Sequence, residues 1–311
     1  MNYSTYKGRY APSPSGRLHL GNILSSLLAW LDVRSNCGNL VFRLEDLDPD
    51  RSYAEYARLM AEDLLWLGLD WDEGWRPGGS LKYTQGARNA LYEDAFDTLR
   101  RRGLIYPCYC SRAQRLAASA PHPGDACDHG CRCRQLTASE RAELERRGRK
   151  PAWKVMVPDR TISFTDGHYG PVEEKLSKGG DFIVRRSDGV FAYQLAVSVD
   201  DADMGITSVV RARDLLSSTA RQIWLIEELG GTPPKYTHAP LMTAPDGRKL
   251  SKREGDLNME TLRKRYSPEE LLGHLASMSG LRENASPVTA KELAADFSWD
   301  RVALNDIIID I

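Results

Sequence analysis

The sequence contains no long uninterrupted hydrophobic segment. Its longest apolar stretch, residues 23–33, is broken by Ser25, Ser26 and Asp32, whereas a membrane-spanning helix needs about 20 predominantly apolar residues. The N-terminus also lacks the basic segment and apolar core of a secretory signal. We therefore expect a soluble, cytoplasmic protein that acts without a membrane.

The chain has little net charge and no compositional bias. With 42 Lys and Arg against 43 Asp and Glu, its formal net charge is −1, which argues against a broad, nonspecific clamp on nucleic acid. The basic clusters at 100–102 and 146–150 either contact phosphates or are solvated helix ends. The sequence has no internal repeat, and 311 residues with 41% apolar side chains suffice for one large core or two modest ones.

Cysteine is almost confined to one segment. Five of the six cysteines lie between positions 108 and 133, and Cys37 stands alone. Close cysteine pairs separated by a loop are typical of tetrahedral zinc, and a chain of this size in a reducing compartment needs no disulfide knot. Four thiolates would close the coordination shell, so the zinc would be structural. The most regular ligand set is Cys108, Cys110, Cys127 and Cys131, with Cys133 or His129 as alternates in the second pair.

Two short motifs together predict an ATP site. The first, Ser13–Asn22, follows a strand-like stretch at Gly8–Ala11 and opens an amphipathic run over residues 23–31. Its small residues let the backbone approach a phosphate at a helix N-terminus, where unpaired N–H groups and the helix dipole favour negative charge. His19 in this loop can donate to a phosphoryl oxygen. The second motif is Lys249–Arg253.

The core of the lysine motif, Lys-Leu-Ser-Lys, occurs twice, at 175–178 and 249–252. The second copy follows a strand-like stretch and a turn at Pro245–Gly247, so it lies at the end of a strand, where doubly wound sheets bind ligands. The first copy leads through two glycines into a β run, and we interpret it as an exposed basic loop. The second copy is therefore the candidate for ATP.

Apolar periodicity predicts alternating strands and helices with one interruption. Strands are expected at 40–44, 152–157, 161–164, 181–185, 191–199 and 239–242, and helices at 53–67, 88–102 and 215–229, before two or three short closing helices. This order favours an α/β fold, a Rossmann-like parallel sheet split by a zinc-containing α+β insertion and followed by a short helical C-terminal segment. The expected divisions are 1–105 and 190–256 for the two halves of the nucleotide-binding domain, 106–189 for the insertion and 257–311 for the helical segment.

Five segments carry a more specific signal. They are Arg9–Asn22, Phe42–Asp48, Tyr193–Val197, Val210–Leu216 and Lys249–Lys252. Together, and in this order over nearly the whole chain, they resemble the catalytic core of the class I glutamyl-tRNA synthetases. Such an enzyme joins the carboxylate of glutamate to the α-phosphate of ATP, releases pyrophosphate and transfers the glutamyl group to RNA. The resemblance implies magnesium bound with the nucleotide.

Chain length favours a short branch of that family. The sequence ends at position 311, too soon after Lys252 for the anticodon-binding domain of the full-length members. Val197 stands where many full-length members carry an amide residue near the substrate, and the cysteine pattern resembles the zinc site of the short paralogues. These paralogues attach glutamate to queuosine, the modified wobble nucleoside of tRNA(Asp). The partners implied are L-glutamate, ATP and queuosine-bearing tRNA(Asp), and we expect a monomer.

The resemblance implies a glutamate pocket. Arg9 would pair with the side-chain carboxylate of glutamate through planar charge-assisted hydrogen bonds, which lysine reproduces poorly. Glu45 would hold the α-ammonium group, and Arg211 would bind the α-carboxylate. The resemblance also implies that three further residues line the pocket: Ala11, Ser13 and Tyr193. Each charged residue also has a structural interpretation, as a member of a buried ion pair.

The resemblance likewise assigns the ATP site. His19, Gly21 and Asn22 would meet the phosphates, and His19 and Asn22 would act in catalysis together with Lys249 and Lys252. Lys252 would neutralise charge as pyrophosphate leaves. Two other enzymatic interpretations remain: a minimal glutamyl-tRNA synthetase that charges tRNA(Glu), and a nucleotidylyltransferase. The latter shares a histidine loop but requires neither the glutamate pocket nor the cysteine-rich insertion.

Overall fold

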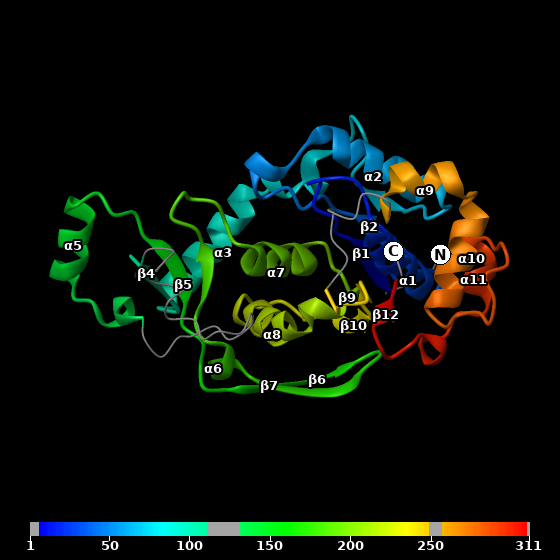
Figure 1. The fold of residues 1–311 in the computed structure, drawn as a ribbon. Helices are drawn as coiled ribbons and strands as arrows, with labels where there is room; N and C mark the ends of the chain where they lie inside the picture. Colours follow the sequence, from blue (N-terminus) through cyan, green and yellow to red (C-terminus); the bar gives the residue numbers. More distant parts are fainter. Residues whose placement is uncertain (1–5, 111–130, 249–256, 310–311) are drawn as a thin grey trace.

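Parallel strands form the centre of the molecule (Figure 1). The computed structural model describes residues 6–110, 131–248 and 257–309. Strands β1 (Lys7–Tyr10), β2 (Asn39–Phe42) and β3 (Glu73–Gly74) pair in parallel in that order, and β9 (Ser208–Ala212) pairs in parallel with β10 (Lys235–Ala239). The Thr207 N–H donates to Lys7 O at 2.9 Å, so β9 lies beside β1.

Helices cover the strands. The first, α1 (Leu20–Ser35), presents successive leucines that are buried with the C-terminal helices in one apolar cluster. Helices α3 (Asn89–Arg101), α7 (Tyr193–Asp203) and α8 (Thr219–Glu228) contribute to a second cluster. With α2 (Ala54–Trp66), these bounds confirm the predicted helices at 53–67 and 88–102, whereas α8 begins later than predicted, after a 3₁₀ turn at Arg213–Ser218.

The predicted strand at 191–199 is wrong, because this segment forms α7. Four consecutive residues, Leu195 to Ser198, are buried, so this turn of the helix is enclosed on every side. A short, mostly apolar run that is buried all round cannot be told from a buried strand by periodicity.

The segment between the parallel strands contains antiparallel structure. Strands β4 (Ile105–Cys108), β5 (Ala152–Val155) and β8 (Phe182–Arg185) form one sheet in that order, with α5 (Ala138–Arg146) at the far end of the molecule (Figure 1). Strands β6 (Thr161–Asp166) and β7 (Gly170–Lys175) form a hairpin beneath α8. The predicted loop at 175–178 is instead the single helical turn α6 (Leu176–Gly179), because Leu176 is buried.

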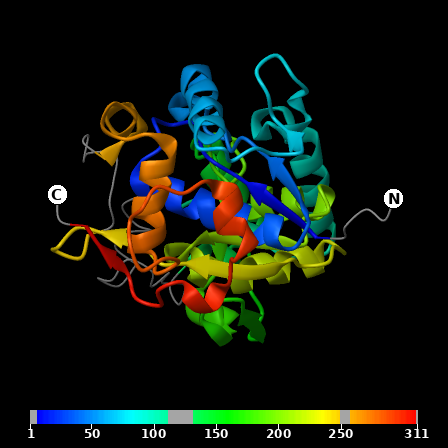
Figure 2. The same ribbon diagram turned by 90° about the vertical axis from the view of Figure 1, so that its right-hand side faces the viewer.

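Short elements close the chain. Strand β10 ends at Ala239 and β11 (Met242–Thr243) follows, so the predicted strand at 239–242 is interrupted around Pro240, which has no N–H to donate. Helices α9 (Met259–Arg265), α10 (Pro268–Met278) and α11 (Ala290–Ala295) group beside α1, and β12 (Ile307–Ile308) pairs with β11 (Figure 2). Within the described ranges, none of the helices combines the length and apolarity needed to cross a bilayer.

Candidate active site

A cleft opens where β1 and β9 end. Its volume is about 450 Å³, within the range of small-molecule sites. Because the carboxyl ends of parallel strands meet at one edge, residues distant in sequence converge here. Eight predicted site residues line it: Arg9, Ala11, Ser13, His19, Asn22, Glu45, Tyr193 and Arg211. Lys249 and Lys252 lie outside the described residues.

His19 is the N-cap of α1. Its Nδ1 accepts a hydrogen bond from the Asn22 N–H at 3.4 Å, and Asn22 Oδ1 accepts from the His19 N–H at 3.3 Å. Since Nδ1 is an acceptor, the neutral ring carries its proton on Nε2. The cap therefore leaves Nε2–H as the donor of the neutral ring beside the cleft, and its donation to a phosphoryl oxygen stays a prediction.

Gly21 gives the His19 ring its space. A Cβ atom at position 21 would lie 3.3 Å from His19 Cε1 and 3.4 Å from Nδ1. Gly21 does not line the cleft, but the absence of its side chain lets the ring fold back over the first turn of α1.

Arg211 is a buried cation surrounded by neutral groups. Its Nε donates to His238 Nε2 (3.0 Å), Nη1 to Gln222 Oε1 (2.6 Å), and Nη2 to both Leu215 O (3.1 Å) and Thr219 Oγ1 (2.8 Å). Four of its five N–H groups are thus engaged, and one on Nη1 remains. Among the described residues, no carboxylate lies within ion-pair distance of its guanidinium. A buried charge without a counter-ion is costly, so this site favours an anionic ligand.

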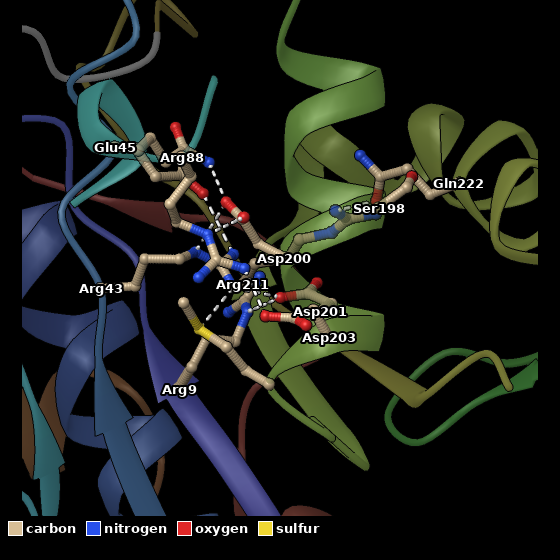
Figure 3. Close-up of polar contacts among 12 residues, drawn as sticks. Arg9, Arg43, Glu45, Arg88, Ser198, Asp200, Asp201, Asp203, Arg211 and Gln222 are labelled. Carbon is tan, nitrogen blue, oxygen red and sulfur yellow. Dashed lines mark hydrogen bonds and ion pairs between the residues drawn. The ribbon is translucent and has the colours of Figure 1, made fainter. Parts of the chain in front are cut away.

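Arg9 and Glu45 belong to a charged network beside the cleft (Figure 3). Arg9 Nη1 donates to Val210 O at 3.0 Å, and its Nε lies 3.6 Å from Asp201 Oδ1. Glu45 accepts from Arg43 at 3.3 Å. Burial raises the pKa of the Glu45 carboxyl, while the Arg43 and Arg9 guanidinium groups oppose this and favour the carboxylate.

The network continues into the interior on α7, and the sequence interpretation missed this part. Asp200 accepts from Arg88, Gln85 and Tyr92, and Asp201 accepts from Arg43 at 2.7 Å. Figure 3 shows these carboxylates facing Arg43 and Arg88. The sequence did contain a signal for this network: Asp200 and Asp201 directly follow an apolar run. Because buried carboxylates require partners, such a pair predicts cations or hydrogen-bond donors nearby.

Helix α7 also contains two positions that the sequence singled out. Tyr193 begins the helix and lines the cleft, and burial raises the pKa of its hydroxyl. Val197 is fully buried one turn further on and does not line the cleft.

The chain that follows the lysine motif is attached to the phosphate loop. The Met259 N–H donates to Leu18 O at 3.0 Å. The buried Asp63 carboxylate accepts from Arg17 of the loop (2.9 Å) and from Arg263 of α9 (3.0 Å). One carboxylate thereby joins the phosphate loop to helix α9.

Four cysteines gather at the edge of the antiparallel sheet. The Sγ atoms of Cys108, Cys110, Cys131 and Cys133 all lie within 4.8 Å of one another, and three of the pairs are 3.6–3.8 Å apart. A tetrahedral zinc with Zn–S bonds of about 2.3 Å requires sulfur separations of about 3.8 Å. The donor set therefore fits structural zinc, with the alternate ligand Cys133 as its fourth member. Cys127 and His129 lie outside the described residues.

Comparison with known proteins identifies the family. The profile described as "tRNA synthetases class I (E and Q), catalytic domain" matches residues 6–306. The chain belongs to this family of class I synthetases. It is accordingly an ATP-dependent ligase of the aminoacyl-tRNA synthetase type.

This synthetase matches short relatives along nearly their whole length. It is 47% identical over 307 residues to the "Glutamyl-Q tRNA(Asp) synthetase" of Symbiobacterium thermophilum, covering 97% of this chain and 95% of the relative. The protein of the same name from Nitratidesulfovibrio vulgaris is 46% identical over 291 residues, covering 92% and 90%. "Glutamate--tRNA ligase 2" of Syntrophus aciditrophicus is 37% identical over 315 residues, but only 65% of that protein is covered.

Solved structures agree with this assignment. The crystal structure of a glutamate tRNA ligase from Elizabethkingia meningosepticum, in complex with its amino acid, superposes with a TM-score of 0.81 at 25% identity. The match covers 98% of this synthetase and 67% of that chain. The class I synthetase fold expected from the sequence is confirmed.

Proposed function

We propose that this synthetase activates L-glutamate with ATP and transfers the glutamyl group to the queuosine nucleoside of tRNA(Asp). The observation that carries the proposal is the end-to-end match to two relatives bearing that name, in contrast to the partial match to a glutamate–tRNA ligase. The two parallel sheets would act together as a Rossmann-like nucleotide-binding unit spanning 1–105 and 190–256, with 106–189 as its insertion and 257–311 as its helical end.

In the first step, the glutamate α-carboxylate attacks the α-phosphate of ATP, and pyrophosphate leaves. The remaining N–H of Arg211 would bind the α-carboxylate, whose charge would balance the buried guanidinium. Arg9 would face the side-chain carboxylate and Glu45 the α-ammonium group. Holding both anions in line is the main contribution that a site of this kind makes to the rate.

The phosphates would lie at the N-terminus of α1. His19 would donate from Nε2, as its capping geometry favours, and Asn22 would lie beside it. Lys249 and Lys252 would add positive charge opposite the departing pyrophosphate, and magnesium would accompany ATP. The hydrogen bond from the Met259 N–H to Leu18 O supports this proposal, because it holds residues that follow the lysine motif next to the phosphate loop.

In the second step, a hydroxyl of the queuosine cyclopentenediol would attack the carbonyl carbon of the glutamyl-adenylate, so that an ester forms, the bond to the phosphate oxygen breaks and AMP leaves. Zinc would be held by Cys108, Cys110, Cys131 and Cys133, a closed set of thiolates that would stabilise the insertion and take no part in the reaction.

The test is transfer of labelled glutamate by the purified protein. Its substrates are queuosine-containing tRNA(Asp), unmodified tRNA(Asp) and tRNA(Glu), each with ATP. We expect only the queuosine-bearing RNA to be labelled. Labelling of tRNA(Glu) instead would make the protein a minimal glutamyl-tRNA synthetase, the candidate that the glutamate–tRNA ligase relatives favour.

A further inference from the structure

A chain of buried polar groups runs from the β6–β7 hairpin to the candidate glutamate pocket. Asp166 ends β6, His238 lies on β10, and Arg211 lies on the adjacent β9, paired with His238 in register. All three are 5% exposed or less. Asp166 Oδ2 lies 2.5 Å from His238 Nδ1, and His238 Nε2 lies 3.0 Å from Arg211 Nε.

The direction of every hydrogen bond in this chain follows from Arg211. A guanidinium can only donate, so His238 Nε2 must accept. The neutral imidazole then carries its proton on Nδ1, where the Asp166 carboxylate accepts it. A carboxylate that fixes a histidine tautomer so that the far ring nitrogen can accept is an established arrangement in enzymes.

The other oxygen of Asp166 is committed elsewhere. Oδ1 accepts from three backbone N–H groups, those of His168 (3.0 Å), Tyr169 (2.9 Å) and His238 (3.3 Å). The carboxylate therefore cannot rotate without losing them, and only Oδ2 faces the ring.

The hairpin turn packs directly against β10. The Gly167 N–H donates to Tyr236 O at 2.9 Å, and a Cβ atom at position 167 would lie 2.2 Å from Thr237 Oγ1. The turn is thus seated directly on the strand that carries His238.

We propose that Asp166 and His238 are positioning residues for Arg211, so that the hairpin of the insertion sets the affinity of the pocket for glutamate. This rests on the proposed function of Arg211 as the ligand of the glutamate α-carboxylate. Four of the five N–H groups of Arg211 are held by the protein, and the relay holds the one on Nε. The orientation of the remaining N–H, on Nη1, depends on these four hydrogen bonds.

The decisive variant is Asp166→Asn. Because Oδ1 is fixed by three N–H donors, the new amide NH₂ would face His238 Nδ1 and donate to it. The ring proton would move to Nε2 and oppose the Nε–H of Arg211. In glutamate-dependent ATP–pyrophosphate exchange by the full chain, we expect the KM for glutamate to rise about tenfold or more and the KM for ATP to stay within about twofold.

A double-variant cycle distinguishes two roles of Asp166. It can act by setting the tautomer of His238, or only by holding the hairpin turn in place. His238→Gln retains a carbonyl oxygen as acceptor for Arg211 but has no tautomer to set. In that background Asp166→Asn should raise the glutamate KM less than about threefold. Equal effects in both backgrounds would overturn the proposal. The matched control is Asp181→Asn, which neutralises another buried carboxylate of the insertion, one that accepts from the Val157 N–H, and should leave the glutamate KM unchanged.

The tautomer of His238 can also be measured in the unaltered protein, with the His238→Gln variant used only to assign the signal. Long-range ¹H–¹⁵N correlation spectra of ¹⁵N-histidine protein should show His238 as the Nδ1–H tautomer, identified by its loss in His238→Gln. An Nε2–H tautomer would refute the relay. Glutamate-dependent exchange without labelling of queuosine RNA would refute the proposed acceptor and leave the relay intact, so the two failures are distinguishable.

Discussion

Arg43 offers the sharpest test of the charged network, because it is fully buried among three carboxylates. It lies 2.7 Å from Asp201, 3.3 Å from Glu45 and 3.6 Å from Asp200. Arg43→Met retains most of the volume but removes the cation. Of these carboxylates, Asp200 keeps Arg88 as a partner and Asp201 keeps only the longer contact to Arg9. Removal of one member of a buried ion pair costs about 3–5 kcal/mol, and we expect a loss of that size in the free energy of unfolding at pH 7.

The pH dependence of this loss has a definite sign. Without Arg43, the Glu45 carboxyl loses the cation that most opposes the effect of burial, so its pKa rises further in the folded state. A raised pKa favours the folded state at low pH and disfavours it as pH increases, so the gap between the variant and the original protein should narrow as pH falls from 8 toward 5. Arg43→Met combined with Asp201→Asn removes one of the stranded charges and should recover at least about 1 kcal/mol.

Guanidinium chloride unfolding followed by circular dichroism measures these differences. The control is Arg58→Met, which breaks a half-exposed pair with Glu62 on α2 and should change stability by less than about 0.5 kcal/mol. A loss below about 1 kcal/mol for Arg43→Met, or no recovery in the double variant, would refute the view that this cation holds the network together.

Three further predictions follow from single contacts. Cys133→Ser should abolish the binding of about one zinc per chain while Cys127→Ser retains it, as measured by metal analysis of purified protein; the reverse result would restore the set predicted from spacing. Gly21→Ala should raise the KM for ATP about three- to tenfold in pyrophosphate exchange, because the new Cβ displaces the His19 ring; an unchanged KM would contradict this. Burial lowers the pKa of His238 from its ordinary value of 6.5, so the ring stays neutral at pH 7. Its contribution to stability is present above pH 6.5 and is lost as pH falls through the lowered pKa, and the KM for glutamate should be constant above pH 6.5 and rise only below it; a rise that begins at higher pH would be inconsistent with this assignment.

The sequence predicted eight of the residues that line the cleft, mainly through its resemblance to the class I glutamyl-tRNA synthetases. The phosphate loop is a local pattern, since its turn, its histidine and the helix that follows are contiguous. Arg9 and Arg211 lie one residue before the ends of β1 and β9, Glu45 follows β2, and parallel strands bring such positions to one edge. The resemblance implied that these three residues share one pocket, and this arrangement of strands gives the physical reason that they meet.

Other features depend on tertiary contacts that leave no local pattern. The segment at 191–199 has the composition of a strand, and only enclosure by other elements makes it a helix. Spacing alone could not choose between Cys127 and Cys133, because both lie near Cys131. Asp166 and His238 are 72 residues apart, and their contact exists only because the hairpin folds back onto β10.

The insertion is made of two parts with different attachments. Around the cysteines, Tyr106, Cys108, Tyr109 and Cys133 form a small apolar cluster of their own, whereas Ile162 of the hairpin belongs to the same cluster as α3, α7 and α8. A change confined to the metal-bearing part would therefore leave the packing of the rest of the fold largely intact. A change in the hairpin turn would instead act on β10, against which the turn packs.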